Sequence, residues 1–476
     1  MSSSKDTWYR HVFLPPLKRV VGFGAAQPRL RLFAQFLVLF ALFFVVAWRK
    51  LDPDFGWHLQ SGLYIRAHGV PTHDIFTYTA PHFPWINHEW GNDVIVSWLY
   101  GLGGYGLLAV LYAGLWGAAL VIAGRRARLG VLLLAAAAVF PYAGIRPVSW
   151  TVLFLAVTFR AIWSPRRRLI WLLPLLFVPW ANLHAGFIIG LVIILYSAVY
   201  YRRPALFGIF GLAALATCLN IYGPRLYVEV GRTLFDPSLH RQVAEWAPLS
   251  FVSLADVFII VWGAGGVLFE QRSIRRWLRP SVPLLLASIS ANRNLPLFVI
   301  SAAAECSQYV TTGAEALLAA GGKLVRRGLL LAALAVVLAT AYWARSEVWP
   351  INQNREAAYP RQAVAYLRLH ACGGRLFNDY NYGGYLIWRL DSKVPVYIDG
   401  RMPSWKDETG QKYMTRYYQL LAHPEQYRTE FARYGIHCAL LGHGHLNGPM
   451  ITRLERDGWR PVIDADGSVL LLAPKP

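Results

Sequence analysis

Long apolar runs separated by short polar segments make up the first two thirds of the chain. The run LFAQFLVLFALFFVVAW (32–48) approaches the roughly 20 apolar residues needed to cross a bilayer. Such runs predict membrane spans at about 31–49, 104–123, 129–145, 148–163, 169–182, 186–200, 204–219, 254–270, 281–291, 295–310 and 328–344. The pattern therefore predicts a mainly α-helical, polytopic membrane protein with about eleven spans.

The pattern changes after residue 345. Apolar residues at every second position predict strands in RLFNDY (375–380), KVPVYIDG (393–400), HCALLGH (437–443) and SVLLLAP (468–474). The segments with helical character are PRQAVAYLRLH (360–370) and EQYRTEFARYG (425–435). Strands and helices that alternate across short glycine-containing turns predict a small C-terminal α/β domain over residues 345–476.

The composition of the chain and the positions of its charged residues indicate how its segments lie relative to a membrane. The chain is 55% hydrophobic and only 15% charged, yet its formal net charge is +21. A basic protein can bind nucleic acid, but here the Lys and Arg residues gather in short clusters between apolar runs, as the positive-inside rule predicts for cytoplasmic loops. These clusters lie at 125–128, 166–168, 202–203, 272–279 and 323–327.

This distribution predicts a membrane topology and no nucleic-acid partner. The basic N-terminus (1–30) is cytoplasmic, the transmembrane domain covers 31–344, and its first external loop (50–103) and the C-terminal domain lie outside. Cys372 and Cys438 both lie in the external domain, where an oxidising compartment permits a disulfide, but two cysteines leave that bridge open.

Ionisable residues crowd into the start of the first external loop, and such groups at a membrane boundary usually mark function. Asp52 and Asp54 form a D-x-D pair. The pair can share one divalent cation, Mg²⁺ or Mn²⁺, or one carboxylate can act as a base while the other orients it. Alternatively, the aspartates cap an interfacial helix in FGWHLQSGLYIRAHG (55–69). Both interpretations stay open.

A second polar element, Asn87-His88-Glu89-Trp90, lies later in the same loop. His88 and Glu89 can ligate a metal, hold a phosphate or polarise a hydroxyl. Alternatively, they are surface groups anchored at the membrane interface by Trp85 and Trp90. The sequence contains no P-loop, no G-x-S-x-G and no H-E-x-x-H, so motifs of soluble enzymes assign no function.

The order of these features resembles the GT-C superfamily of membrane glycosyltransferases, which use polyprenyl-phosphate sugars. Its members include protein O-mannosyltransferases, aminoarabinose transferases and the catalytic subunit of oligosaccharyltransferase. In them, an acidic motif after the first span leads into an interfacial helix. The residues that match this motif here are Asp54, His58, Gly62, Ile65, Gly69 and Pro71. The resemblance covers about residues 30–310, although His88-Glu89-Trp90 replaces the family's His-Pro-Pro type element.

Within the superfamily, the chain resembles a bacterial group with a C-terminal external domain, so the resemblance implies a bacterial inner (cytoplasmic) membrane. It also implies an inverting transfer of a sugar from a polyprenyl-phosphate donor to a hydroxyl of a lipid, glycan or protein at the outer membrane face. Asp54 is then the catalytic base, supported by Asp52 or Glu89. The donor phosphate needs cationic or hydrogen-bonding partners. The candidates on the outer side of the predicted topology are His58, His88, Arg146, His184, Arg225 and Arg293.

Two other functions compete with a transferase. A transporter for lipid-linked saccharides would explain the many spans, but transporter sites lie near the membrane midplane and not in an external loop. The other is a non-catalytic assembly protein that binds cell-envelope glycan. In the C-terminal domain, Asp399-Gly400-Arg401 follows a predicted strand and is either a turn held by an Asp–Arg pair or a binding group.

Overall fold

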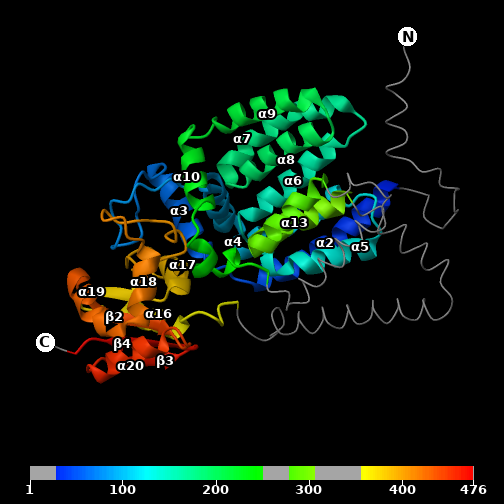
Figure 1. Cartoon of the computed structure of the whole chain (residues 1–476). Coiled ribbons are helices and arrows are strands. Elements are labelled where there is room, and N and C mark those ends of the chain that lie inside the picture. The colour runs from blue at the N-terminus through cyan, green and yellow to red at the C-terminus, as the bar shows by residue number, and fades with distance from the viewer. Residues whose placement is uncertain (1–27, 250–277, 306–354, 475–476) are drawn as a thin grey trace, which may run out of the picture.

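The structure, a computed structural model, describes residues 28–249, 278–305 and 355–474. Figure 1 shows a helical bundle and a smaller α/β part that carries the C-terminus. The helices of the bundle are α2 (Pro28–Arg49), α3 (Phe55–His68), α4 (Trp90–Ala123), α5 (Leu129–Val139), α6 (Val148–Ile162), α7 (Leu173–Leu183), α8 (Phe187–Tyr200), α9 (Pro204–Thr217), α10 (Arg225–Leu234), α11 (Leu239–Gln242) and α13 (Ser281–Ser290). Short 3₁₀ turns, η1 (Phe140–Tyr142), η2 (Arg167–Leu172), η3 (Ala244–Trp246) and η5 (Asn292–Asn294), join several of them.

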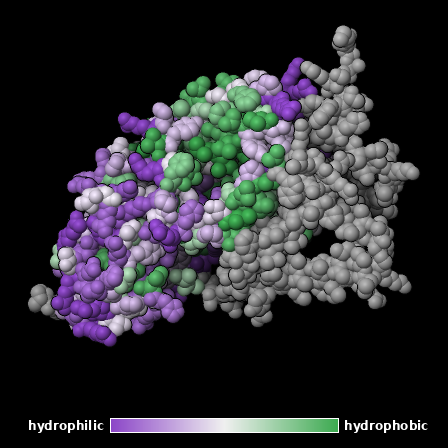
Figure 2. All heavy atoms as spheres, in the orientation of Figure 1, coloured by the Kyte–Doolittle hydropathy of each residue, from purple (hydrophilic) through white to green (hydrophobic). Residues whose placement is uncertain are grey.

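Two of the described helices, α2 and α4, are long and apolar enough to cross a membrane. Shorter apolar helices occupy the predicted spans at 148–163, 186–200, 204–219 and 281–291. The predicted spans at 254–270 and 328–344 lie outside the described residues, so the count of about eleven spans stays a prediction. Figure 2 shows apolar side chains gathered over α7, α8 and α9, where exposed residues include Leu175, Val192, Val199, Phe207, Leu212 and Leu215.

The helix α4 bends where the predicted span begins. Gly103 and Gly104 have non-helical backbone angles, and Gly104 has a φ of +61°, which glycine adopts without a steric penalty. The residues after this kink coincide with the predicted span at 104–123. The residues before it extend the helix along α3, so α4 carries polar side chains to the site described below.

The C-terminal part contains a four-stranded sheet in the order β1-β2-β4-β3. Its strands are β1 (Arg375–Asn378), β2 (Ile436–Gly442), β3 (Arg460–Ala465) and β4 (Ser468–Leu472); β1 is parallel to β2, and the other pairs are antiparallel. The helices around it are α16 (Arg361–Leu369), α17 (Gly383–Arg389), α18 (Tyr413–Ala422), α19 (Tyr427–Tyr434) and α20 (Gly448–Arg456). The predicted α/β class is confirmed for this part, although β3 was not predicted.

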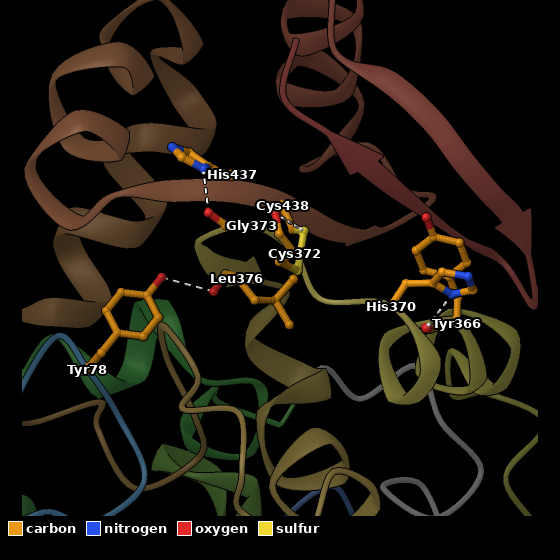
Figure 3. Close-up of a disulfide and its surroundings, with 8 residues drawn as sticks. All are labelled: Tyr78, Tyr366, His370, Cys372, Gly373, Leu376, His437 and Cys438. Atoms are coloured by element: carbon orange, nitrogen blue, oxygen red, sulfur yellow. Dashed lines mark hydrogen bonds between the residues drawn. A yellow bond between two sulfur atoms is a disulfide. The ribbon is translucent and has the colours of Figure 1, made fainter. Parts of the chain in front are cut away.

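The prediction of a sheet strand at 393–400 was wrong. The segment is extended, but it pairs with the first external loop: Val396 N–H donates to Phe76 O (3.0 Å), and Tyr78 N–H donates to Val396 O (3.3 Å). The hydroxyl of Tyr78 also reaches Leu376 O in β1 at 2.9 Å (Figure 3). Alternating apolar residues predict an extended backbone but cannot identify its partner.

A disulfide joins Cys372 to Cys438 and so ties the entry to β1 to strand β2 (Figure 3). The bond closes a loop of 66 residues, which restricts the unfolded chain and stabilises the domain. Beside it, His437 Nδ1 lies 2.9 Å from Gly373 O. The bridge left open in the sequence is therefore formed.

One hydrophobic core is shared by α3, the first external loop and the C-terminal sheet. Phe55 in α3 packs edge-on against Trp388 in α17, with ring centroids 5.1 Å apart. The backbones of the two helices approach closely, because a Cβ added to Gly56 would lie 1.8 Å from Gly384 O. A Cβ on Gly384 would lie 2.1 Å from Pro53 O. The loop and the C-terminal domain therefore pack as one body.

This contact predicts that Gly384→Ala destabilises the protein. The added methyl group collides with backbone that cannot rotate away, and overpacking of this kind costs about 1–3 kcal/mol. Thermal unfolding of the detergent-purified chain should show a lowered Tm. The matched control is Gly448→Ala, where nothing lies within 4 Å of the added Cβ. Equal Tm values for both variants would contradict the close contact between α17 and the loop.

Candidate active site between the helical bundle and the C-terminal domain

A cavity of about 970 Å³ lies where the first external loop, the loops of the bundle and the C-terminal domain meet. Eight of the nine site residues predicted from the sequence line it: Asp52, Asp54, His58, His88, Glu89, Arg146, His184 and Arg293. The ninth, Arg225, is exposed at the start of α10 and does not line this cavity. Residues from four separate loops thus converge on one space.

Asp54 lies at the first turn of α3, but its side chain makes no cap hydrogen bond to the helix backbone. Instead, its Oδ1 accepts a hydrogen bond from Trp57 Nε1 (3.0 Å) and lies against Gly400, whose added Cβ would be 1.8 Å away. Burial and the negative charge of Asp52 raise the pKa of Asp54 to about 7. The carboxyl group can therefore exchange a proton near neutral pH, as a general base requires.

Asp52 has a different role, because an arginine neutralises it. Its Oδ1 accepts the N–H of Asp54 (3.0 Å), and its Oδ2 lies 2.8 Å from Arg146 Nε. The Nη2 of Arg146 also pairs with Glu245. Burial raises the pKa of Glu245, but the charges of Arg146 and Arg293 outweigh burial and hold it below its usual range.

The predicted cation site at Asp52 and Asp54 does not fit this arrangement. The guanidinium of Arg146 already occupies the Asp52 carboxylate, and its positive charge would repel a metal ion there. Among the described residues, no group of three or more His, Cys, Asp or Glu side chains is arranged to hold a metal.

His58 is held by a fully buried carboxylate that the sequence did not identify as functional. Its Nδ1 lies 2.6 Å from Asp93 Oδ1, and Asn87 Nδ2 donates to Asp93 Oδ2 at 2.7 Å. Burial lowers the pKa of His58, but Asp93, by charge and hydrogen bond, and Glu89 outweigh burial and raise it to about 9. His58 is therefore an imidazolium at neutral pH, and its Nε2 lies 3.7 Å from Glu89 Oε2.

His184 is a neutral hydrogen-bond donor. Its Nδ1 accepts the N–H of Gly186 (3.0 Å) and lies 2.8 Å from the hydroxyl of Thr151, which itself accepts from Trp180 Nε1 (2.8 Å). With Nδ1 used as an acceptor, the proton resides on Nε2, 3.5 Å from Glu89 Oε1. Burial and the charges of His88 and Arg293 keep the pKa of His184 well below its usual value.

The remaining predicted residues, Arg293 and His88, also line the cavity. The guanidinium carbon of Arg293 lies 4.5 Å from the centroid of the Trp246 ring, which is a cation–π contact. Both residues line the cavity. Burial lowers the pKa of Arg293, although an arginine remains charged in proteins. His88 is the most exposed of the site histidines, and its Nε2 lies 3.8 Å from Glu89 Oε1.

The C-terminal domain contributes residues that the sequence reasoning missed or left open. Arg401 forms the expected pair with Asp399, with Nε at 2.9 Å from Oδ1, and its Nη2 also lies 2.8 Å from Asp74 in the first external loop. The ring of Trp85 lies 4.5 Å from this guanidinium. Arg401 and Tyr380 both line the cavity. The Asp–Arg pair that holds this turn therefore also joins the C-terminal domain to the first external loop.

No protein-family profile and no curated protein matches the chain. Among solved structures, it is similar to the oligosaccharyltransferase AglB of Archaeoglobus fulgidus in complex with an inhibitory peptide and a dolichol-phosphate (13% identity, TM-score 0.57, covering 86% of this chain and 69% of that one). The apo form of the oligosaccharyltransferase from that organism gives 14% identity and a TM-score of 0.55, covering 88% and 70%. Its form tethered to an acceptor peptide containing the NVT sequon gives 13% and 0.54, covering 85% and 68%. The chain therefore shares the fold of this archaeal oligosaccharyltransferase, one of the enzymes that the resemblance of its first external loop pointed to.

Proposed function

We propose that the protein is an inverting glycosyltransferase of a bacterial inner membrane, which moves a hexosyl or pentosyl group from a polyprenyl-phosphate donor to a hydroxyl at the outer face. One observation carries the proposal: a carboxyl group with a pKa of about 7 and three cationic side chains share one cavity between an apolar helical bundle and a polar domain. A base and a phosphate-binding group must lie this close for a single displacement at an anomeric carbon.

The chemistry divides between a carboxyl group and the cationic side chains of the cavity. Asp54 removes the proton of the acceptor hydroxyl as that oxygen bonds to the anomeric carbon. The bond from this carbon to the phosphate oxygen breaks, and the electron pair leaves with the phosphate. Arg293, Arg146 and the His58 imidazolium stabilise the negative charge that develops there. Attack and departure on opposite sides of the carbon invert its configuration.

Two further facts support a lipid-linked donor. The exposed apolar surface of α7, α8 and α9 gives an isoprenoid tail a place in the bilayer beside the cavity. The archaeal oligosaccharyltransferase of the same fold was solved with a dolichol-phosphate and, in another form, with an acceptor peptide. For the present chain, the acceptor class we propose is a hydroxyl of a lipid, glycan or protein.

The first test is Asp54→Asn in the purified protein. Wild type incubated with radiolabelled polyprenyl-phosphate sugars and a membrane extract should transfer label, and the variant should lose about 10²–10⁴-fold of the rate, because an amide cannot take the proton. The control is Asp464→Asn, which changes an exposed carboxylate of β3 that does not line the cavity. Undiminished transfer by Asp54→Asn would remove the proposed base.

The pKa of Asp54 also predicts the pH dependence of transfer. A base acts only when ionised, so the rate should fall about tenfold per pH unit below pH 7 and become level above it. The measurement is the initial rate of label transfer between pH 5 and 9. A rate that stays constant down to pH 5 would assign the base to a carboxyl group with an ordinary pKa.

Gly400→Ala should impair catalysis without touching a reacting group. The added Cβ would lie 1.8 Å from Asp54 Oδ1 and must displace the carboxylate, and a misplacement of about 1 Å can cost about 10²-fold in rate. Binding of polyprenyl phosphate, followed by tryptophan fluorescence, should persist. Gly444→Ala, with nothing within 4 Å of its added Cβ, should keep wild-type activity. Full activity of Gly400→Ala would contradict the position of Asp54.

A further inference from the structure

The helix α10 has no role in the proposed reaction, although its first residue, Arg225, was a predicted phosphate-binding residue. One side of α10 faces inward. Leu226 and Val230 belong to the hydrophobic core of the bundle, and Glu229 and Thr233 line the cavity. The helix therefore forms part of the cavity wall, and the proposed reaction leaves its outward side unexplained.

The outward side of α10 carries exposed apolar side chains. Val228 and Phe235 are seven residues apart, which is about two helical turns, so they lie on the same side. Val228 is 63% exposed and Phe235 is 86% exposed, and Ile221, in the turn before the helix, is 51% exposed. Large apolar side chains that gather on one exposed surface mark an interaction site.

Two exposed arginines, Arg225 and Arg232, lie beside these apolar residues. At about 100° of rotation per residue, both fall between Val228 and Glu229 around the helix, and thus between its apolar side and its cavity-lining side. Arg232 Nη1 donates to Glu229 Oε2 (2.8 Å), in agreement with this order. Glu229 is the acid of α10 and is buried, so the exposed charge of the helix is positive.

The predicted topology does not account for these arginines. The positive-inside rule gathers Lys and Arg in cytoplasmic loops, whereas the segment after the predicted span at 204–219 lies on the outer side. An arginine in an outer loop therefore has a partner other than the cytoplasmic face. The phosphates of phospholipids lie just beyond the end of such a span and attract arginine.

The position of α10 in the fold suits contact with the surface of a bilayer. The helix follows α9, whose exposed residues Leu212 and Leu215 belong to the apolar surface of the bundle, and Leu219 continues this surface toward α10. Figure 1 shows α10 at the end of the bundle nearest to the C-terminal part. A helix with an apolar side and a basic edge lies in the interface at such a boundary, with its arginines at the headgroups.

Contacts at both ends hold α10 in one orientation. Before the helix, Tyr222 N–H donates to Asn220 Oδ1 (2.7 Å), and the hydroxyl of Tyr222 accepts the N–H of Asn87 in the first external loop (3.0 Å). After the helix, the carboxylate of Asp236 pairs with Lys412 of the C-terminal domain. The outward side is therefore presented in a fixed position relative to the cavity.

We propose that α10 docks on the outer leaflet of the membrane. Val228 and Phe235 insert among the acyl chains, and the two arginines beside them bind the phosphates of anionic phospholipids. Because the other side of the same helix lines the cavity, docking sets this wall of the cavity at the depth of the phospholipid phosphates. The inference goes beyond the proposed transfer reaction and does not depend on it.

The first test locates position 235 in vesicles of phosphatidylcholine and phosphatidylglycerol. In the full-length chain, Cys218 and Cys306, which lie outside the disulfide, are replaced by alanine, and a nitroxide label is attached to Phe235→Cys. The references are two exposed leucines, Leu215→Cys on α9 and Leu369→Cys at the end of α16. We expect oxygen to relax the labels at 235 and 215 while a water-soluble nickel chelate does not, and the chelate to relax the label at 369.

Three results would overturn the docking. The nickel chelate could relax the label at 235 as strongly as the label at 369, which would place α10 in water. Shielding of the label from both reagents would show that protein covers the helix. Spectral broadening between two labels at 235 would show that a second copy of the chain covers it.

The second test asks whether Arg225 selects anionic phospholipid. A fluorophore is attached at position 235, and its quenching is titrated with brominated phosphatidylglycerol or brominated phosphatidylcholine in the vesicles. Arg225→Gln should lower the preference for phosphatidylglycerol about fivefold, which is the share of one arginine near an anionic surface. The control is Arg428→Gln, an exposed arginine of the C-terminal domain, which should keep the original preference.

An unchanged preference in Arg225→Gln would overturn the headgroup contact. Loss of polyprenyl-phosphate binding without a change in this preference would assign Arg225 to the donor and would overturn it as well. Neither test measures sugar transfer. A wild type that transfers no sugar would therefore overturn the proposed function and leave the docking of α10 standing.

Discussion

The contact between the backbone of α17 and the start of α3 determines the rest of the site. Gly56 and Gly384 let the two helices approach more closely than any side chain would permit, and Gly400 lies directly against the carboxylate of Asp54. Because this contact lies inside a shared hydrophobic core, the first external loop and the C-terminal domain fold as one unit. The cavity is then the space between this unit and the loops of the bundle.

Charge compensation within the cavity explains why Asp54 in particular can act as a base. Asp52 and Glu245 are both paired with Arg146, and Asp93 is paired with His58. In each of these pairs a cation occupies an oxygen of the carboxylate. Among the described acids of the cavity, Asp54 has an indole N–H as its partner and no bonded cation, and burial is therefore free to raise its pKa.

The sequence was sufficient to predict the α3 helix, and eight of its nine candidate residues line the cavity, because the acidic motif is local and the positive-inside rule places its loops on one side. It did not identify Asp93, which resembles any acid in the first turn of a helix. The close contacts of Gly384 and Gly400 were equally hidden, because they depend on segments more than 300 residues apart in the chain. The segment at 393–400 shows the same limit: its pattern predicted an extended backbone, but its partner is the loop and not the sheet.

The construction of the cavity favours chemistry over transport. A carrier must expose its site to each side of the membrane in turn, and this requires that the walls of the site separate. Here the unit of loop and C-terminal domain is bound to the bundle by the ion pair of Asp52 with Arg146 and by that of Lys412 with Asp236. Separating the two walls would leave the buried charge of Asp52 without its partner, which costs several kcal/mol. A rigid, one-sided site of this kind suits a reaction in which the donor's lipid stays in the bilayer and only the sugar moves.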